Sequence, residues 1–187
     1  MDEEKKEKNY KIFLEKLSNV GVDTDKLDKV YGERLKNATF TNSAEFGNAY
    51  DGSLIETVLK VLTPYAVKIN ELLPIEQQVD KSTLVKICLL HHISKSIRLV
   101  PNDNSWEIKT RKLYYKYDTD QPSIRTGLHS LVMAQSCGIP FTAEEAEAMT
   151  VNDRDLTDDQ ARWYSSVMST VIRQANELTY VQINGRG

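Results

Sequence analysis

Hydrophobic positions recur with the spacing of an α-helix near the start of the chain. Tyr10, Phe13, Leu14 and Leu17 stand at i, i+3, i+4 and i+7, so they fall on one face of a helix. The charged residues before them suit a solvated helix start, and Gly21 suits its end. The pattern therefore predicts an amphipathic first helix.

A second helix is expected directly after it. Thr24 is a suitable N-cap, and Leu27, Val30 and Tyr31 form its apolar stripe, which ends near residues 32–35. The polar, glycine-containing segment 36–52 indicates a loop. We therefore expect residues 1–35 to form a helical N-terminal extension to a domain that spans 36–182.

Helical spacing returns after Gly52. Residues 54–69 read as one helix that Pro64 bends or splits. Ser82 is the expected cap of the next helix. Its stripe, made of Leu84, Ile87, Cys88 and His91, keeps i, i+3, i+4, i+7 spacing and is predicted to face the core.

The helical pattern is interrupted between residues 99 and 118. Turn-forming residues follow Pro101, and the segments 106–109 and 112–117 are rich in aromatic and branched side chains. We expect a small β-hairpin here, inserted between helices.

The last third of the chain again predicts helices. One runs from about 123 to 136. Capping boxes at Thr142–Glu145 and Thr157–Gln160 begin a short helix and a long one, and residues 183–187 form a flexible tail. The fold class is thus all-α with one hairpin. The face that we expect the long helix to bury consists of Tyr164, Met168, Val171, Ala175 and Leu178.

Composition narrows the functional classes. The chain has 187 residues and a net charge of −3, with only 2 cysteines and 3 histidines. Cys88 and Cys137 stand in apolar surroundings, which excludes a disulfide scaffold or a zinc ribbon. The pI near 5.7 argues against a nucleic-acid binder.

The start of the chain is charged and no apolar segment approaches the ~18 residues of a membrane span. We therefore expect a cytoplasmic protein that contacts no membrane.

The adjacent histidines His91 and His92 have two interpretations. They could belong to a metal or phosphate site, or His91 could be hydrogen-bonded within the core with His92 at a helix boundary. Lys95, one turn later, could meet a phosphate or carboxylate, or extend past the apolar surface to solvent. The residues alone favour the structural interpretation for each.

Two further segments carry candidate chemistry. The run Asn152–Asp155 offers oxygen ligands for a hard cation, although a solvated helix cap explains it as well. The hairpin aromatics lie beside basic residues and could stack on bases, but cross-strand packing accounts for them too. The aromatics are Trp106, Tyr114, Tyr115 and Tyr117, and the basic residues are Lys109, Arg111, Lys112 and Lys116.

Two segments together resemble a known family. AYDGSLIETVLKVL (49–62) and LVKICLLHHISK (84–95) are similar to the HD-domain phosphohydrolases, in particular the compact type of exoribonuclease HD domains and small bacteriophage proteins. The later blocks of that family, including T-x-E-E-A-x-A (142–148), have counterparts in order from about Ala38 to Leu178. The resemblance implies an HD-like helical bundle.

In the family, histidines and aspartates hold one or two divalent cations that activate water. When the family's metal ligands are carried over to this chain, only the first histidine of the HD pair is kept, as His91. Lys95 and Ser130 are retained around it. The other ligand positions are replaced by Thr57, His92, Thr126, Asn152 and Asn176. The resemblance therefore implies a remnant pocket without a metal or other cofactor, and no catalytic residues.

We accordingly expect a catalytically inactive HD-like protein with a structural or protein-binding role, such as a phage virion component or accessory protein in the host cytoplasm or virion. Its partner would be another protein or a second copy of the chain. As an alternative, Lys95 and Arg125 would bind an anion such as a nucleotide in the metal-free pocket. A second alternative is a metal-dependent phosphohydrolase with atypical ligands, which include His91, His92 and Asp153 or Asp155.

Overall fold

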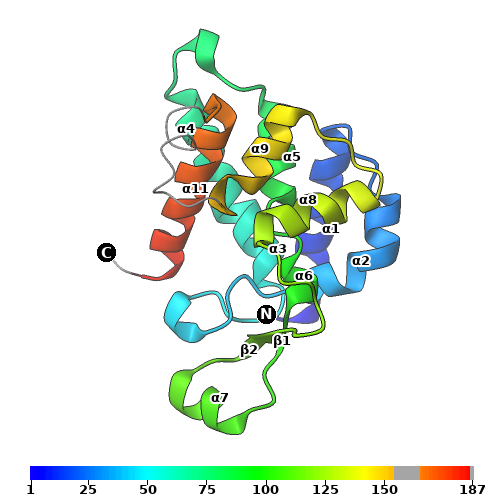
Figure 1. Ribbon diagram of the computed structural model, residues 1–187, viewed down its shortest axis with the longest axis vertical. Coiled ribbons are helices and arrows are strands. Elements are labelled where there is room, and N and C mark those ends of the chain that lie inside the picture. Colours follow the sequence, from blue (N-terminus) through cyan, green and yellow to red (C-terminus); the bar gives the residue numbers. More distant parts are fainter. Residues whose placement is uncertain (154–164, 186–187) are drawn as a thin grey trace.

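The computed structural model describes residues 1–153 and 165–185. Over these residues the chain forms a bundle of α-helices with one pair of short antiparallel strands (Figure 1). This confirms the all-α fold with a small hairpin. The helices are α1 (Glu3–Asn19), α2 (Asp25–Asn37), α3 (Ser53–Thr57), α4 (Thr63–Glu71), α5 (Lys81–Leu90), α6 (Lys95–Arg98), α7 (Ser105–Arg111), α8 (Thr126–Ser136), α9 (Ala143–Thr150) and α11 (Val167–Ile183).

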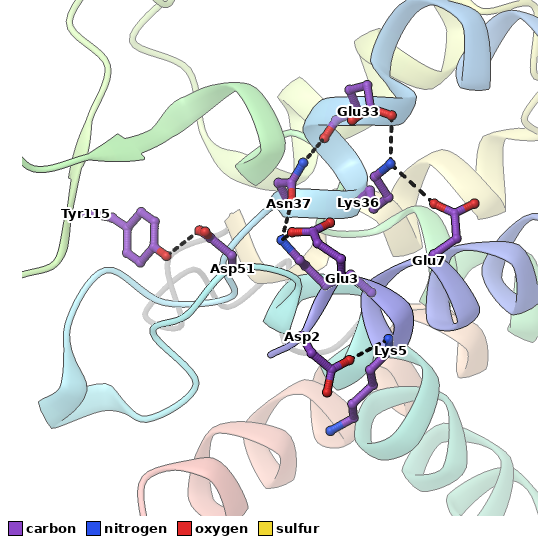
Figure 2. A network of polar contacts seen from close by, with 10 residues as sticks. Asp2, Glu3, Lys5, Glu7, Glu33, Lys36, Asn37, Asp51 and Tyr115 are labelled. Carbon is purple, nitrogen blue, oxygen red and sulfur yellow. Dashed lines mark hydrogen bonds and ion pairs between the residues drawn. The ribbon is translucent and has the colours of Figure 1, made fainter.

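The first two helices pack side by side and contribute to the common core. Phe13 and Leu17 of α1 are fully buried, in the same cluster as the residues of α5. Lys36 of α2 donates to Glu7 of α1 at 3.3 Å, a contact between the two helices that Figure 2 shows, and it also donates to Glu33 of its own helix at 2.8 Å. The expected stripe of α2 is partly wrong, because Val30 is 52% exposed.

The helix expected over 54–69 is one continuous element with a widened turn. Between α3 and α4 the segment η2 (Val58–Leu62) is a π-helix, in which the Thr63 backbone N–H reaches the Val58 carbonyl oxygen. Pro64 follows in the first turn of α4. Because proline has no N–H to donate, the wide turn accommodates it without breaking the helix.

The helix α5 lies at the centre of the bundle. Its predicted stripe of Leu84, Ile87, Cys88 and His91 is buried, with each residue at most 1% exposed. The cap is Asp80 rather than Ser82, since the Asp80 carboxylate accepts the Thr83 N–H at 2.8 Å.

The helices α8, α9 and α11 close the bundle around α5 and α4 (Figure 1). The capping box of Thr142 and Glu145 is present at the start of α9. On α11, the prediction that Leu178 is buried is wrong: Leu178 is 42% exposed, and Thr179 is buried instead. The second capping box and Tyr164 lie outside the described residues.

The inserted hairpin differs from the expectation in one respect. Strands β1 (Leu99–Pro101) and β2 (Tyr115–Tyr117) pair antiparallel, but the segment 106–109 belongs to helix α7 and not to a strand. Asn104 caps α7 by accepting the N–H groups of Trp106 and Glu107. The strands and α7 form a lobe at one end of the molecule (Figure 1), which we call the 99–117 lobe.

The lobe is fastened to the loop before α3. The Tyr115 hydroxyl donates to the Asp51 carboxylate at 2.7 Å, as Figure 2 shows. The Ala44 N–H donates to the Lys112 carbonyl oxygen, next to the short 3-10 turn η1 (Ala44–Phe46).

Among the helices of the described residues, none is long and apolar enough to cross a bilayer.

Candidate functional site

One cavity gathers most of the residues that the sequence singled out. It measures about 310 Å³ and lies where the turn after α5, the N-terminus of α8, the segment after α9 and the helix α11 meet. Its lining residues are His91, His92, Lys95, Arg98, Arg125, Thr126, Gly127, Asn152, Asp153, Asn176 and Tyr180. We call it the His-Lys cavity.

Lys95 is the most deeply buried cation at this cavity. The residue is only 9% exposed, so it does not extend to solvent as one interpretation of the sequence allowed. Its ammonium group donates to the Phe40 carbonyl oxygen at 2.7 Å and to the Tyr180 hydroxyl at 2.9 Å. An ammonium group has three N–H donors, so one has no hydrogen-bond acceptor among the described residues, and the Phe40 ring lies 3.8 Å from the ammonium.

No carboxylate of the described residues forms an ion pair with Lys95. Burying a charge without a counter-charge is costly, so such a group is usually matched by an anion. The Lys95 site is therefore electrostatically incomplete in the part of the chain that the structure describes.

Two arginines add to the positive charge. Arg98, on the short helix after Lys95, donates to the Thr126 hydroxyl at 2.9 Å. Arg125 is exposed at the N-terminus of α8 and keeps its guanidinium accessible to a ligand. Guanidinium groups present paired donors that match phosphate and carboxylate oxygens.

The two histidines are neutral and held by amides. The Asn152 amide nitrogen donates to Nε2 of His91 at 2.8 Å, and Nε2 of His92 donates to the Asn176 amide oxygen at 2.7 Å. Burial and the charge of Lys95 lower the pKa of His91 to about 4. Burial, with Lys95 and His91, also holds the pKa of His92 well below its usual range, although the bond to Asn176 opposes the shift.

The turn that carries the histidines and Lys95 is fixed against α8 by a pair of buried serines. Ser94 donates through its hydroxyl to the Thr126 carbonyl oxygen at 2.9 Å, and its N–H donates to Ser130 at 3.1 Å. Both serines are fully buried. This arrangement gives Ser130 a positioning role.

Asp153 supplies the negative charge among the lining residues. Its carboxylate accepts the N–H groups of Gly127 and Leu128 at 3.0 and 2.6 Å, at the start of α8. The positive end of the helix dipole favours a carboxylate there. Gly127 is needed for this approach, because a β-carbon would lie 2.8 Å from an Asp153 oxygen and 2.2 Å from the Met149 carbonyl oxygen.

These residues do not fit the one or two divalent cations that the HD-domain phosphohydrolases hold. The Nε2 atoms of His91 and His92 are bonded to amides, and the Asp153 carboxylate is bonded to backbone N–H groups. Within 1–153 and 165–185, no three His, Cys, Asp or Glu side chains are grouped so that they could hold a metal ion. The cations at the cavity would also repel a metal ion.

The sequence anticipated part of this site. His91, His92, Lys95, Arg125, Thr126, Asn152 and Asn176 all line the cavity, whereas Thr57 does not. Thr57 is fully buried within the helix that begins at Ser53, and its hydroxyl accepts from the Asn48 amide at 2.8 Å.

Three lining residues were not anticipated as members of the pocket: Arg98, Gly127 and Tyr180. Arg98 stands three places after Lys95, and this helical spacing could have indicated that the two side chains lie on the same side of a helix. Asp153 was expected either as a ligand beside His91 and His92 or as a solvated cap. In the structure it lines the cavity and caps α8, a helix distant in sequence. Asp155 lies outside the described residues.

The chain matches no protein-family model, and no significant match to a curated protein or to a solved structure was found.

Proposed function

We propose that this protein binds a small phosphate-type anion in the His-Lys cavity without turning it over. The observation that carries the proposal is the buried ammonium group of Lys95, which lines the cavity and has two neutral acceptors but no carboxylate partner among the described residues. A phosphate or similar oxyanion supplies the missing counter-charge.

The charge of the cavity supports the same class of ligand. With both histidines neutral, Lys95, Arg98 and Arg125 face the single carboxylate of Asp153 among the lining residues. Two of the cations are arginines, whose donors suit an anion with several oxygens. The resemblance to HD domains agrees with a phosphate ligand, and the replaced ligand positions agree with binding rather than hydrolysis.

The test is calorimetric titration of the full chain with inorganic phosphate and pyrophosphate. We expect binding by the wild type and a loss of about tenfold to 100-fold in affinity for Lys95→Met, because a charge-assisted bond is lost. Arg125→Gln, at an exposed position, should weaken binding without changing the fold. Lys109→Met, an exposed cation of the 99–117 lobe, is the matched control and should bind as the wild type does.

The proposal fails if the wild type shows no heat with either anion, or if Lys109→Met weakens binding as much as Lys95→Met does.

A structural or protein-binding role is the second candidate. It is favoured by Leu72 and Ile75, which are 85% and 86% exposed at the connection between α4 and α5. Large apolar side chains exposed together are typical of contact surfaces. Failure of the anion titration would leave this role as the better explanation of the scaffold.

A further inference from the structure

A second cavity adjoins the His-Lys cavity. It measures about 280 Å³ and shares Lys95, Arg98, Thr126 and Tyr180 with the first. Its other lining residues are Phe40, Thr41, Asn42, Phe46, Leu99 and Tyr117. We call it the aromatic cavity. The two cavities are thus neighbouring compartments on either side of the same four side chains.

The aromatic cavity is lined by rings from four separate segments. Phe40 and Tyr180 form its inner part, with ring centroids 5.4 Å apart. Phe46 in η1 and Tyr117 in β2 are 44% and 60% exposed, although each ring would gain from burial. Exposed rings that line one cavity are well suited to stack on a flat ligand group.

The shared residues are the cations. The Lys95 ammonium lies 3.8 Å from the centre of the Phe40 ring, and the Arg98 guanidinium lies 5.6 Å from the centre of the Tyr117 ring. Positive charge is therefore concentrated between the polar compartment and the aromatic one. A ligand that uses both compartments has an anionic group near these cations and a flat ring beside them.

The volumes agree with a ligand larger than a free phosphate. Each compartment is close to the lower end of the range of about 300–1,000 Å³ typical of small-molecule sites. Inorganic phosphate occupies only a small part of one compartment, and it leaves the rings of the other unused.

We propose that the ligand is a small aromatic phosphate, with its phosphate in the His-Lys cavity and its ring against Phe46 and Tyr117. This inference rests on the proposed function and specifies the class of anion. If the inference is correct, the aromatic ring of the ligand contributes measurably to the binding affinity, which it would not do at a general phosphate site.

The experiment compares ligands that differ in the ring. Wild-type protein is titrated with inorganic phosphate, phenyl phosphate, ribose 5-phosphate and a nucleoside 5′-monophosphate. We expect at least one of the two aromatic ligands to bind about tenfold or more tightly than its ring-free counterpart, as stacking on aromatic side chains implies. Preference for the nucleotide would place a sugar between ring and phosphate, and preference for phenyl phosphate would place the ring directly beside it.

Substitutions in the aromatic cavity test whether the contribution of the ligand's ring to the affinity comes from this cavity. Tyr117→Ala and Phe46→Ala should reduce the affinity for the aromatic ligand toward that of its ring-free counterpart and should reduce the affinity for inorganic phosphate much less. Tyr114→Ala, a partly exposed tyrosine of the same lobe that does not line this cavity, should change neither affinity.

Equal binding of aromatic and ring-free phosphates overturns this inference and leaves the proposed function intact. An absence of binding by every ligand overturns both. A loss in Tyr114→Ala equal to that in Tyr117→Ala also overturns the assignment to this cavity.

Discussion

At the scale of single residues, Asp153 has two opposing effects. Its carboxylate stabilises the start of α8 by accepting two backbone N–H groups, and it adds a negative charge to a cavity that three cations line. A carboxylate at a helix N-terminus is favourable for the fold. The same charge repels an incoming anion, so stability and ligand affinity compete at this residue.

Asp153→Asn separates these effects. We expect the free energy of unfolding to fall by about 1 kcal/mol, because the cap loses its charge. The affinity for phosphate should rise several-fold, because repulsion at short range is removed. Urea denaturation and calorimetry measure the two quantities. Asp120→Asn, at an exposed position before α8, is the control and should change neither.

Weaker phosphate binding by Asp153→Asn would contradict this expectation. It would mean that the geometry of the cap shapes the cavity more strongly than its charge does.

Single residues also show where sequence reasoning is sufficient. His91 and Lys95 were identified because helical spacing places them on one side of a helix, and His92 because it is adjacent to His91; both are local properties. Arg98 follows by the same spacing. Tyr180 and the capping of α8 by Asp153 could not be predicted, because both depend on how α9 and α11 pack against α8 and α5, and no local pattern encodes that packing.

At the scale of elements, the local signals succeeded where the cap and the helix are adjacent in sequence. The capping box at Thr142 begins α9 as predicted. Between residues 106 and 109 the aromatic and branched composition favoured a strand, but the cap at Asn104 and the ion pair of Glu107 with Arg111 favour a helix. The segment therefore forms a helix, although its composition alone favours a strand.

Glu56 joins two elements and makes their contact depend on pH. It accepts ion pairs from Lys5 of α1 at 2.9 Å and from Lys60 at 2.8 Å, while Tyr50 donates to it at 2.8 Å. Burial alone would raise the pKa of Glu56, but the bonds from Lys60, Lys5 and Tyr50 outweigh it and lower the pKa to about 2. The carboxylate form therefore favours the folded state.

The stabilisation by Glu56 is fully present above pH 4.5, its ordinary pKa, and is lost as the pH falls toward about 2. Glu56→Gln should reduce the free energy of unfolding by about 1–2 kcal/mol at pH 7, a value that allows for solvent screening. The difference from wild type should shrink between pH 4.5 and 2. Urea denaturation at several pH values measures it.

Glu33→Gln is the matched control, because the Glu33 side chain is 82% exposed in its pair with Lys36. It should cost less than about 0.5 kcal/mol. A loss in Glu56→Gln that is the same at pH 2.5 and pH 7 would show that its effect is not electrostatic.

At the scale of the whole molecule, α1 and α2 share the buried cluster of the remaining helices. Leu17 is fully buried in that cluster, together with Leu84 and Leu90 of α5. A segment that shares a core is expected to unfold with it in one transition. Residues 1–35 were expected to be an extension of the domain, and cooperative unfolding tests that division.

Leu17→Ala should lower the free energy of unfolding by about 2–5 kcal/mol through the cavity that it leaves. Denaturation followed by both far-ultraviolet circular dichroism and tryptophan fluorescence should give one coincident transition at lower urea. The exposed neighbour Lys16→Ala should stay within about 0.5 kcal/mol of wild type. A separate early transition in Leu17→Ala would instead support an independent N-terminal unit.

The π-helical turn η2 has a consequence for which side chains face the core. Through α3, η2 and α4 the buried positions Leu54, Val58, Leu62 and Ala66 recur every four residues, a spacing that drifts around a regular α-helix. If one residue of the wide turn is left out of the count, the separations between these buried positions become a mixture of three and four residues. Such a mixture keeps one face of an α-helix toward the core.

The helix from Ser53 to Glu71 thus keeps one face toward the core because its π-helical turn holds one residue more than a regular turn. Pro64 would not fit if this turn were regular. In a regular α-helix its ring would clash with the carbonyl group four residues earlier, at Lys60.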